Sequence, residues 1–483
     1  MERWDAIVCG GGTAGPVLVA RLVKAGRRVL LLEAGPDYGP FDGGVWPPEL
    51  VDSTTIPSTH DWGYTSGGEL PGRTLAYERA RVIGGCSAHN GCTVSWGHRA
   101  DFDGWMLSGW SADDLLPLFA EASQRLRTRR FAQEELSPLH RAFIDTGAGL
   151  GLPEVDDLDT LDGVAGVCAE PSNSPGGVRW NAAFAYLDPV RASPLLEIRD
   201  RALVDRVLIE QGRAVGVRAI RHDGAFEARA DLVVLTAGAY GTPAVLLRSG
   251  IGPADELRHL GVDVLADNAG VGANLHDHPS FELIYQGTDE LDRRDAAFVA
   301  SGRTVPDEQG FVKVASSRCK DAPFDLHVFS QVLTTRRPGI FVACLTPRSR
   351  GQVTLASADP DAPPLLDHRF LSDEEGHDLA VLTDGVTLAR DFATQPTLAE
   401  LLGAEVEPGP KINLATAIRA SVVHYWHPVG TCAMGIACDE QGRVFGVEGL
   451  VVADASLIPT TVRATTNLPT VVVAERIAEW LNR

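Results

Sequence analysis

Apolar positions near the N-terminus follow the order strand, helix, strand. Residues 5–9 form a short apolar run typical of a buried strand, and residues 16–26 have the spacing of an amphipathic helix that ends at Gly26. A second apolar run at residues 28–32 stops at Glu33. The pattern predicts a βαβ unit, and therefore a parallel sheet with helices packed on it.

Later in the chain the pattern changes to short apolar runs separated by turn residues. Residues 309–314, 324–330, 339–345 and 352–356 are predicted to be strands of a second region, and residues 373–392 a helix with an acidic start. Residues 53–73 are rich in Thr, Ser, Pro and Gly and are expected to cover a ligand as a loop or lid. A chain of 483 residues is long enough for two domains.

Composition excludes several classes of partner. The chain is 44% hydrophobic and has a net charge of −21, so it can bury a large core but lacks a basic balance suited to nucleic acid. Its apolar runs are too short for an integral membrane segment, and no signal-peptide pattern precedes the first strand. Eight cysteines without a CxxC pair indicate reduced thiols in a cytoplasmic protein.

A glycine-rich loop joins the first predicted strand to its helix. Gly10 stands at the tight turn, Gly12 where backbone approaches a pyrophosphate, and Gly15 where helix and strand pack closely. Glu33 ends the second strand, where an acid bonds ribose hydroxyls and disfavours a 2′-phosphate. A glycine-rich turn without a ligand is the alternative. The strands, helix and acid together favour FAD or NAD over NADP.

Further motifs decide between FAD and NAD. Small-residue loops occur at residues 77–91 (YERARVIGGCSAHNG) and 236–243 (TAGAYGTP), the latter after a predicted strand at 231–235. They are followed by VGANLHDHP, HYWHPVGTCAMG and a closing VVADASLIPTTVRATTNLPT. With the first glycine loop, these motifs in this order resemble the glucose–methanol–choline (GMC) family of flavin oxidoreductases over nearly the whole chain. The motifs are most similar to those of choline oxidase-like members.

The resemblance implies both a fold and a cofactor. The fold is α/β, with a Rossmann-like FAD-binding domain (residues 1–150, 190–280 and 420–483) interleaved with an α+β substrate-binding domain (151–189 and 281–419) built on an antiparallel sheet. The residues expected to bind FAD are Gly10, Gly12, Thr13, Ala14, Gly15, Glu33, Ala34, Arg81, Val82, Gly85, Cys86, Ser87, His89, Asn90, Gly91, Val207, Ala237, Gly238, Asp454, Ala455, Asn467, Pro469 and Thr470.

Two residues near the C-terminus are the candidate catalytic pair. Alcohol oxidation requires a group that takes the hydroxyl proton, which histidine does near neutral pH. The resemblance assigns this role to His427, with hydride transfer to flavin N5, and assigns the second catalytic position to Asn467. Taken alone, His427 also fits a satisfied core histidine and Asn467 a turn residue. His424 is interpreted as structural, because Pro428 argues against a helix there.

His89 carries a separate hypothesis about the cofactor. In choline oxidase-like members the histidine of the GGCSxHN loop is bonded covalently to the flavin, and GGCSAHNG here repeats that pattern. The alternative is a histidine that only packs in the core. Gly91 stands where choline-specific members have a serine, which puts choline itself in doubt as the substrate.

Other polar residues allow weaker assignments. Glu308 and Trp426 are assigned to the substrate pocket, although Glu308 also fits a solvated or paired carboxylate. His276, Asp277 and His278 form an HxH pattern, but no third or fourth ligand cluster accompanies them, so no metal site is predicted.

The sequence therefore predicts FAD-dependent oxidation of a small alcohol to a carbonyl, with oxygen or a redox carrier as electron acceptor. Three alternatives remain: a dehydrogenase that passes electrons to a quinone or a mycofactocin-type carrier, a flavin-containing hydroxynitrile lyase, and a non-catalytic flavin-binding protein. The oligomeric state is not indicated.

Overall fold

The computed structural model describes residues 3–66, 72–158, 160–334 and 336–483. The predicted βαβ unit is confirmed. It consists of β1 (Arg3–Cys9), α1 (Gly15–Lys24) and β2 (Val29–Leu32), and the two strands pair in parallel. Gly26 follows the helix with a positive φ of 84°, the left-handed conformation that glycine adopts easily after a helix end. The apolar run of β2 is fully buried.

The first sheet has the strand order β6-β2-β1-β9-β8-β7, and β19 also pairs with β9. Strands β6, β2, β1 and β19 run parallel with the end of β9, whereas β7, β8 and β9 form an antiparallel meander. Helix α6 packs against β7 of this sheet, and α12 packs along α1. The bounds are β6 (Leu196–Arg199), β7 (Leu203–Glu210), β8 (Arg213–Arg221), β9 (Gly224–Leu235), β19 (Leu450–Val452), α6 (Gly238–Arg248) and α12 (Asn467–Leu481).

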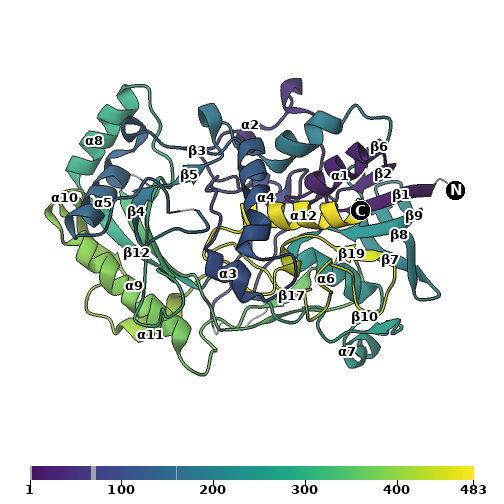
Figure 1. Cartoon of the computed structure of the whole chain (residues 1–483). Helices are drawn as coiled ribbons and strands as arrows, with labels where there is room; N and C mark the ends of the chain where they lie inside the picture. Colours follow the sequence, from purple (N-terminus) through teal and green to yellow (C-terminus); the bar gives the residue numbers. More distant parts are fainter. Residues whose placement is uncertain (1–2, 67–71, 159, 335) are drawn as a thin grey trace.

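The second sheet is antiparallel throughout, in the order β18-β12-β15-β14-β13-β4, as predicted for the second region. Helices α5 and α9 pack against it, and Figure 1 shows the two sheets at opposite ends of the molecule with α12 reaching between them. The bounds are β4 (Gly166–Ala169), β12 (Ser280–Gly287), β13 (Gly310–Val314), β14 (Leu326–Thr334), β15 (Arg337–Cys344), β18 (Leu402–Glu407), α5 (Pro138–Gly149) and α9 (His377–Ala393).

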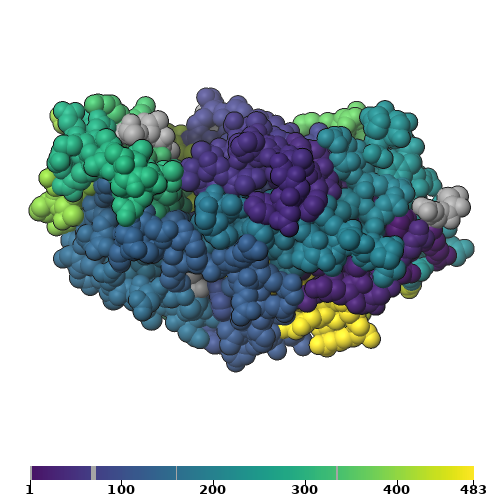
Figure 2. Space-filling view, turned by 90° about the horizontal axis from the view of Figure 1, so that it is seen from above, coloured from purple at the N-terminus to yellow at the C-terminus, as the bar shows by residue number. Residues whose placement is uncertain are grey.

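Shorter elements connect these layers. They are α2 (Pro48–Val51), α3 (Arg99–Gly104), α4 (Ala112–Arg125), α7 (Ala254–His259), α8 (Asp289–Ala300), α10 (Pro396–Ala399), α11 (Leu414–Ser421), β3 (Arg129–Arg130), β5 (Pro171–Ser172), β10 (Ile251–Gly252), β11 (Ala266–Asp267), β16 (Gln352–Leu355) and β17 (Pro364–Asp367). Figure 2 shows an elongated outline in which the N-terminal part of the chain occupies the middle of one face.

The packing differs from the predicted boundaries in three places. Strand β16 pairs with β17 instead of joining the second sheet; it packs against α6, and Val353 lies in a buried cluster that includes Tyr240 of α6. Helix α5 was predicted with the nucleotide-binding region but packs in the core of the second sheet. Residues 180–187 were predicted with the second region but pack in the first core, against α1.

Helix α9 begins four residues later than predicted. The acidic start that suggested a helix at residue 373 lies outside it, and Asp373 instead accepts a hydrogen bond from the backbone N–H of His377. An aspartate before a helix is favoured as a cap for exposed N–H groups. The helix therefore begins at His377.

The predicted lid is only partly described, because residues 67–71 of the 53–73 segment lie outside the described residues. Its described part pairs antiparallel with the chain before the second glycine loop, through Asp61 with Ala80 and Thr65 with Ala76. All eight cysteines are free. Among the described helices, none has both the length and the apolar character needed to cross a bilayer.

Helix α8 buries a carboxyl group that offers a stability test. Asp295 is 4% exposed, and neither of its oxygens has a hydrogen-bond partner among the described residues. Burial, with a smaller contribution from Asp292, raises its pKa to about 6. The unfolded chain loses this proton at lower pH than the folded protein, so Asp295 lowers stability progressively as pH rises through about 4 to 6.

We predict that Asp295→Asn raises the melting temperature at pH 8, by about 1–2 °C, because it removes a buried charge. The gain should disappear near pH 4, where the native carboxyl is protonated. Differential scanning calorimetry at both pH values measures this. Asp289→Asn, at the exposed start of α8, is the control and should not stabilise. A gain of equal size at both pH values would contradict the explanation.

Candidate active site

The three glycine loops predicted from sequence meet in space. Gly10 has a φ of 114°, and a Cβ on Gly15 would lie 2.0 Å from the Gly10 carbonyl oxygen. The first two loops touch: Gly84 N–H donates to the Gly11 carbonyl (2.7 Å), and a Cβ on Gly85 would lie 2.6 Å from the Gly12 Cα. These positions require glycine because backbone approaches backbone. A Cβ on Gly12 itself would meet no atom closer than 3.8 Å.

Glu33 lies beside the first loop as a buried carboxylate. Its two oxygens accept hydrogen bonds from the N–H groups of Gly11 and Gly35, each at 2.7 Å. Burial raises its pKa to about 7, against the lowering effect of these hydrogen bonds. A carboxylate can accept about four hydrogen bonds, so Glu33 keeps acceptor capacity for the hydroxyl groups of a ribose.

The third loop is fixed by the C-terminal part of the chain. Thr236 Oγ1 donates to the Gly10 carbonyl (2.7 Å), and Asp454 accepts hydrogen bonds from Gly238 N–H (2.8 Å) and the Thr242 hydroxyl (2.6 Å). The other oxygen of Asp454 accepts from Ser456. Asp454 therefore joins the third loop to the segment after β19.

The other residues assigned to the cofactor lie on these loops or on segments next to them, with one exception. They are Thr13, Ala14, Ala34, Arg81, Val82, Cys86, Ser87, His89, Asn90, Gly91, Ala237, Ala455, Pro469 and Thr470. Val207 is the exception: it lies in β7, and its N–H donates to Ser249 Oγ at the far end of α6. The described contacts do not bring Val207 to the glycine loops, and its role stays a prediction.

A buried aspartate positions the loop that carries His427. Asp277 is 1% exposed, and both its oxygens lie 3.0 Å from the backbone nitrogen of His427, whose N–H donates to them. Trp426, one residue earlier, has a φ of 57°, a strained conformation for a bulky residue. Its carbonyl accepts a hydrogen bond from Arg79 (3.0 Å) and its indole N–H donates to Glu78 (2.9 Å). These bonds hold the strained turn.

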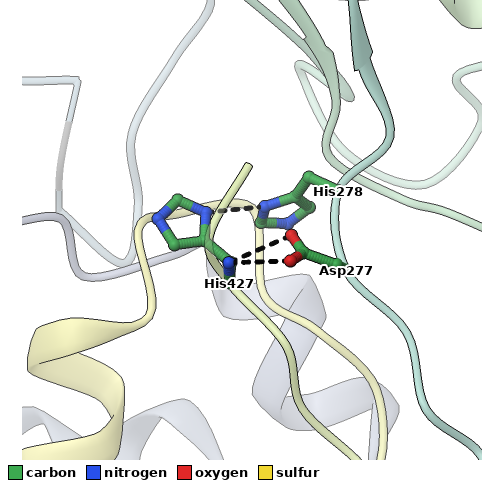
Figure 3. Close-up of side chains that lie close together, drawn as sticks. All are labelled: Asp277, His278 and His427. Atoms are coloured by element: carbon green, nitrogen blue, oxygen red, sulfur yellow. Dashed lines mark hydrogen bonds between the residues drawn. The ribbon is translucent and has the colours of Figure 1, made fainter. Parts of the chain in front are cut away.

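A histidine pair defines which nitrogen of His427 is available (Figure 3). His278 Nε2 lies 3.0 Å from the Val462 carbonyl oxygen, which can only accept, so Nε2 carries the proton. His278 Nδ1 is then an acceptor, and it lies 3.0 Å from His427 Nδ1. His427 Nδ1 is therefore the protonated nitrogen, and His427 Nε2, which points away from His278, carries a lone pair.

The same short segment also positions the chain before Asn467. His276 Nε2 accepts a hydrogen bond from Thr461 N–H (2.9 Å), while its Nδ1–H donates to the Asn274 carbonyl (2.7 Å). With the bond from His278 to Val462, two histidines hold residues 461–462, six and five residues before Asn467. Both nitrogens of each histidine are engaged, which fits a structural role better than metal binding.

Asn467 begins α12, and its amide has no hydrogen-bond partner among the described residues. Both polar atoms of the side chain are buried. A buried amide without partners is expensive in free energy, by about 1–3 kcal/mol, so it indicates a position where a ligand or substrate supplies the partners. A lone-pair nitrogen on His427 and an amide on Asn467 together can accept a proton and orient a hydroxyl group.

Burial keeps the His427 side chain uncharged. The residue is 9% exposed, and its pKa lies well below the usual 6.5, first because of burial and then because the basic groups His278 and Arg79 disfavour a further positive charge there. A buried imidazole favours its uncharged form. Asp277 titrates in the opposite sense: burial raises its pKa to about 7, and Arg79 lowers it.

The sequence missed part of this arrangement. Asp277, His278 and Arg79 contact the His427 loop, yet nothing in their spacing identifies them as partners of a residue about 150 or 350 positions later. The HxH pattern was the one visible signal. His424, interpreted as structural, donates from Nε2–H to the Ala76 carbonyl (2.9 Å), a contact that fits this interpretation.

Three remaining predicted residues lie at different distances from this centre. Trp426 is adjacent to His427 and 41% exposed. His89 is buried in the second loop, and its Nε2 lies 2.8 Å from the Thr59 carbonyl. Glu308 lies just before β13, at the edge where Gln309 bonds to Glu135 and Ser137; no described contact brings it to His427.

Comparison with known proteins gives consistent matches along the chain. Profiles described as GMC oxidoreductase match residues 4–280 and 347–474. Choline oxidase from Arthrobacter globiformis is 33% identical, with 99% of this chain and 94% of that protein covered. An oxygen-dependent choline dehydrogenase from Burkholderia pseudomallei is 31% identical, with 100% and 94% covered.

Solved structures agree with this fold. Pyridoxine 4-oxidase from Mesorbium loti superimposes with a TM-score of 0.89 at 27% identity, covering 99% of this chain and 98% of that one. A formate oxidase superimposes with a TM-score of 0.86 at 21% identity, with 99% and 98% covered. The second likeness concerns the fold alone.

The hydrogen-bond direction in the histidine pair can be measured. Nitrogen-15 NMR of histidine-labelled protein should show His427 protonated at Nδ1 and bare at Nε2, and neutral from pH 8 to below pH 6, where an ordinary imidazole titrates near 6.5. His278→Gln should perturb the His427 signals and identify them. Protonation of His427 at Nε2 in the neutral ring would contradict the assignment.

Proposed function

The chain belongs to the GMC oxidoreductase family, and from that premise we propose that it oxidises a primary or secondary alcohol to a carbonyl with His427 as the base. Members of this family are FAD-dependent oxidoreductases, and this chain is one of them. The observation that carries the proposal is the bare Nε2 of His427, which the bond to His278 leaves available.

The glycine loops fit FAD. The open space at Gly12 leaves room for a pyrophosphate against the backbone, and the start of α1 places free N–H groups and a positive dipole end there. Glu33 supplies acceptors for ribose hydroxyls. When bound, FAD supplies an acceptor for the hydride that leaves the alcohol carbon. These residues would hold the cofactor, while the chemistry of the proton falls to the chain.

His427 and Asn467 divide the work on the substrate. Nε2 of His427 takes the hydroxyl proton as the carbonyl forms, and a neutral base of this kind functions without first losing a proton of its own. The Asn467 amide, which has buried polar atoms without partners, donates a hydrogen bond to the substrate oxygen and holds it in line. We assign Trp426, exposed beside His427, to the substrate pocket.

The relatives support oxygen as the electron acceptor. Two of them are named choline oxidase and oxygen-dependent choline dehydrogenase. A dehydrogenase that uses a quinone or a mycofactocin-type carrier would reduce a dye with little peroxide, and peroxide yield against dye reduction separates the two. A hydroxynitrile lyase would cleave a cyanohydrin without bleaching the flavin. Choline should be tested as a substrate together with other alcohols, although Gly91 replaces a serine of choline-specific enzymes.

We predict that His427→Ala slows anaerobic reduction of the flavin by alcohol by about 10²- to 10⁴-fold, because the hydroxyl proton loses its acceptor. Stopped-flow absorbance at 450 nm measures the step directly. His222→Ala, in an exposed turn between β8 and β9, is the control and should leave the rate unchanged. Reduction at the native rate by the His427 variant would remove His427 from the mechanism.

A covalent bond between His89 and FAD is a further part of the proposal. Burial lowers the pKa of His89, so its ring is neutral at pH 7, and the bond to Thr59 places a proton on Nε2 and leaves the Nδ1 lone pair. After acid precipitation, the yellow colour should stay with the native protein and leave with the supernatant for His89→Ala. Colour lost completely from the native protein would show that the flavin is held without a bond.

A further inference from the structure

Lysine is rare in this chain, and one lysine is buried beside the histidine pair. The four lysines are Lys24, Lys313, Lys320 and Lys411. Lys24, Lys320 and Lys411 are exposed, whereas Lys313 in β13 is 1% exposed. An ammonium group is costly to bury, so its position calls for a function.

Lys313 joins the second sheet to the segment before Asn467. Its Nζ donates a hydrogen bond to the carbonyl of Arg463 (3.1 Å). His278 donates to the carbonyl of Val462, the preceding residue. Two neighbouring carbonyls are thus held by an ammonium from the sheet and an imidazole from the catalytic centre, four and five residues before Asn467.

Aromatic and basic side chains surround the Lys313 ammonium. The ammonium lies over the rings of Phe311 (5.4 Å) and Phe324 (5.2 Å), contacts that stabilise a cation. His327 stands opposite it in β14. The nearby guanidinium of Arg463 is paired with Asp101 and Asp321.

The titratable and charged groups that face His278 come from several elements. Asp277 precedes it in the chain, His427 and Tyr425 face it from the following loop, and Lys313 and His327 face it from the sheet. Arg79 donates a hydrogen bond to the Trp426 carbonyl in the His427 loop. The charge of Lys313 lowers the pKa of both His278 and His327, in addition to the effect of burial.

We propose that Lys313 is a positioning residue for the reaction proposed above: its buried ammonium fixes the segment that leads to Asn467 and opposes a second positive charge on His278. The consequence concerns the direction of a hydrogen bond. If His278 gained a proton at Nδ1, it would donate to His427 instead of accepting. His427 would then carry its own proton at Nε2, and the base would be lost. Lys313 therefore protects the base against acid.

Two substitutions separate charge from packing. Lys313→Met keeps the length and removes the charge, whereas Lys313→Arg keeps the charge. Lys320→Met removes an exposed charge seven residues away and is the control. Bound FAD per chain and melting temperature report whether each variant folds. Histidine nitrogen-15 titration reads the charge effect without turnover, so it gives a result even if the proposed alcohol oxidation is wrong.

In Lys313→Met, His278 and His427 should titrate at higher pH than in the native protein, by about half a unit or more. With the fastest alcohol among choline, benzyl alcohol, ethanol and glycerol, the acid limb of kcat/KM should move upward by the same amount, about a 3- to 10-fold loss at acid pH. Lys313→Arg should keep both at their native positions, as should Lys320→Met.

The results that overturn the inference are distinct from failure of the proposed function. If Lys313→Met leaves the histidine titration unchanged, the charge of Lys313 does not act on His278 and the inference is wrong, whether or not kcat/KM falls equally at every pH through loss of the bond to Arg463. If no alcohol bleaches the native flavin, the proposed function fails, and the titration alone decides the role of Lys313.

Discussion

Three consecutive buried residues connect the His427 loop to the segment that leads to Asn467, the two parts of the proposed catalytic centre. Asp277 accepts hydrogen bonds from the backbone of the His427 loop, and His276 and His278 hold the segment that leads to Asn467. The strand that follows them, β12, belongs to the second sheet. The segment is therefore the point where both sheets, the base and the amide are fixed to one another. In this structure the HxH pattern, which resembles a metal site, instead joins two segments of the chain through hydrogen bonds.

Burial gives this junction its chemistry as well as its rigidity. In a medium of low polarity an imidazole keeps its neutral form, and a neutral imidazole has one donor and one acceptor. A chain of such rings has a direction: the Val462 carbonyl fixes the proton of His278, which fixes the proton of His427. Arg79 and Lys313 add positive charge on two sides and oppose protonation of the pair. Position and proton state thus have the same origin.

Much of the fold was readable from sequence because its signals are local. The βαβ unit, its glycines and Glu33 follow from short-range patterns, and the order of motifs identified the family. The rest depends on contacts between distant segments. Strand β16, for example, lies outside the second sheet, and its Val353 packs in a cluster with Tyr240 of α6. His427 and Asn467 were assigned by resemblance, whereas Asp277, His278 and Lys313, which contact the segments that carry them, have no periodicity or spacing that marks them.

The most direct test is a double-mutant cycle on flavin reduction under anaerobic conditions. If His278 acts through His427, its substitution has nothing left to disturb once the base is removed. We predict that His278→Gln slows reduction in the native background, and that the double variant with His427→Ala is no slower than His427→Ala alone. Losses that multiply in the double variant would show that His278 acts independently, and would contradict the central claim.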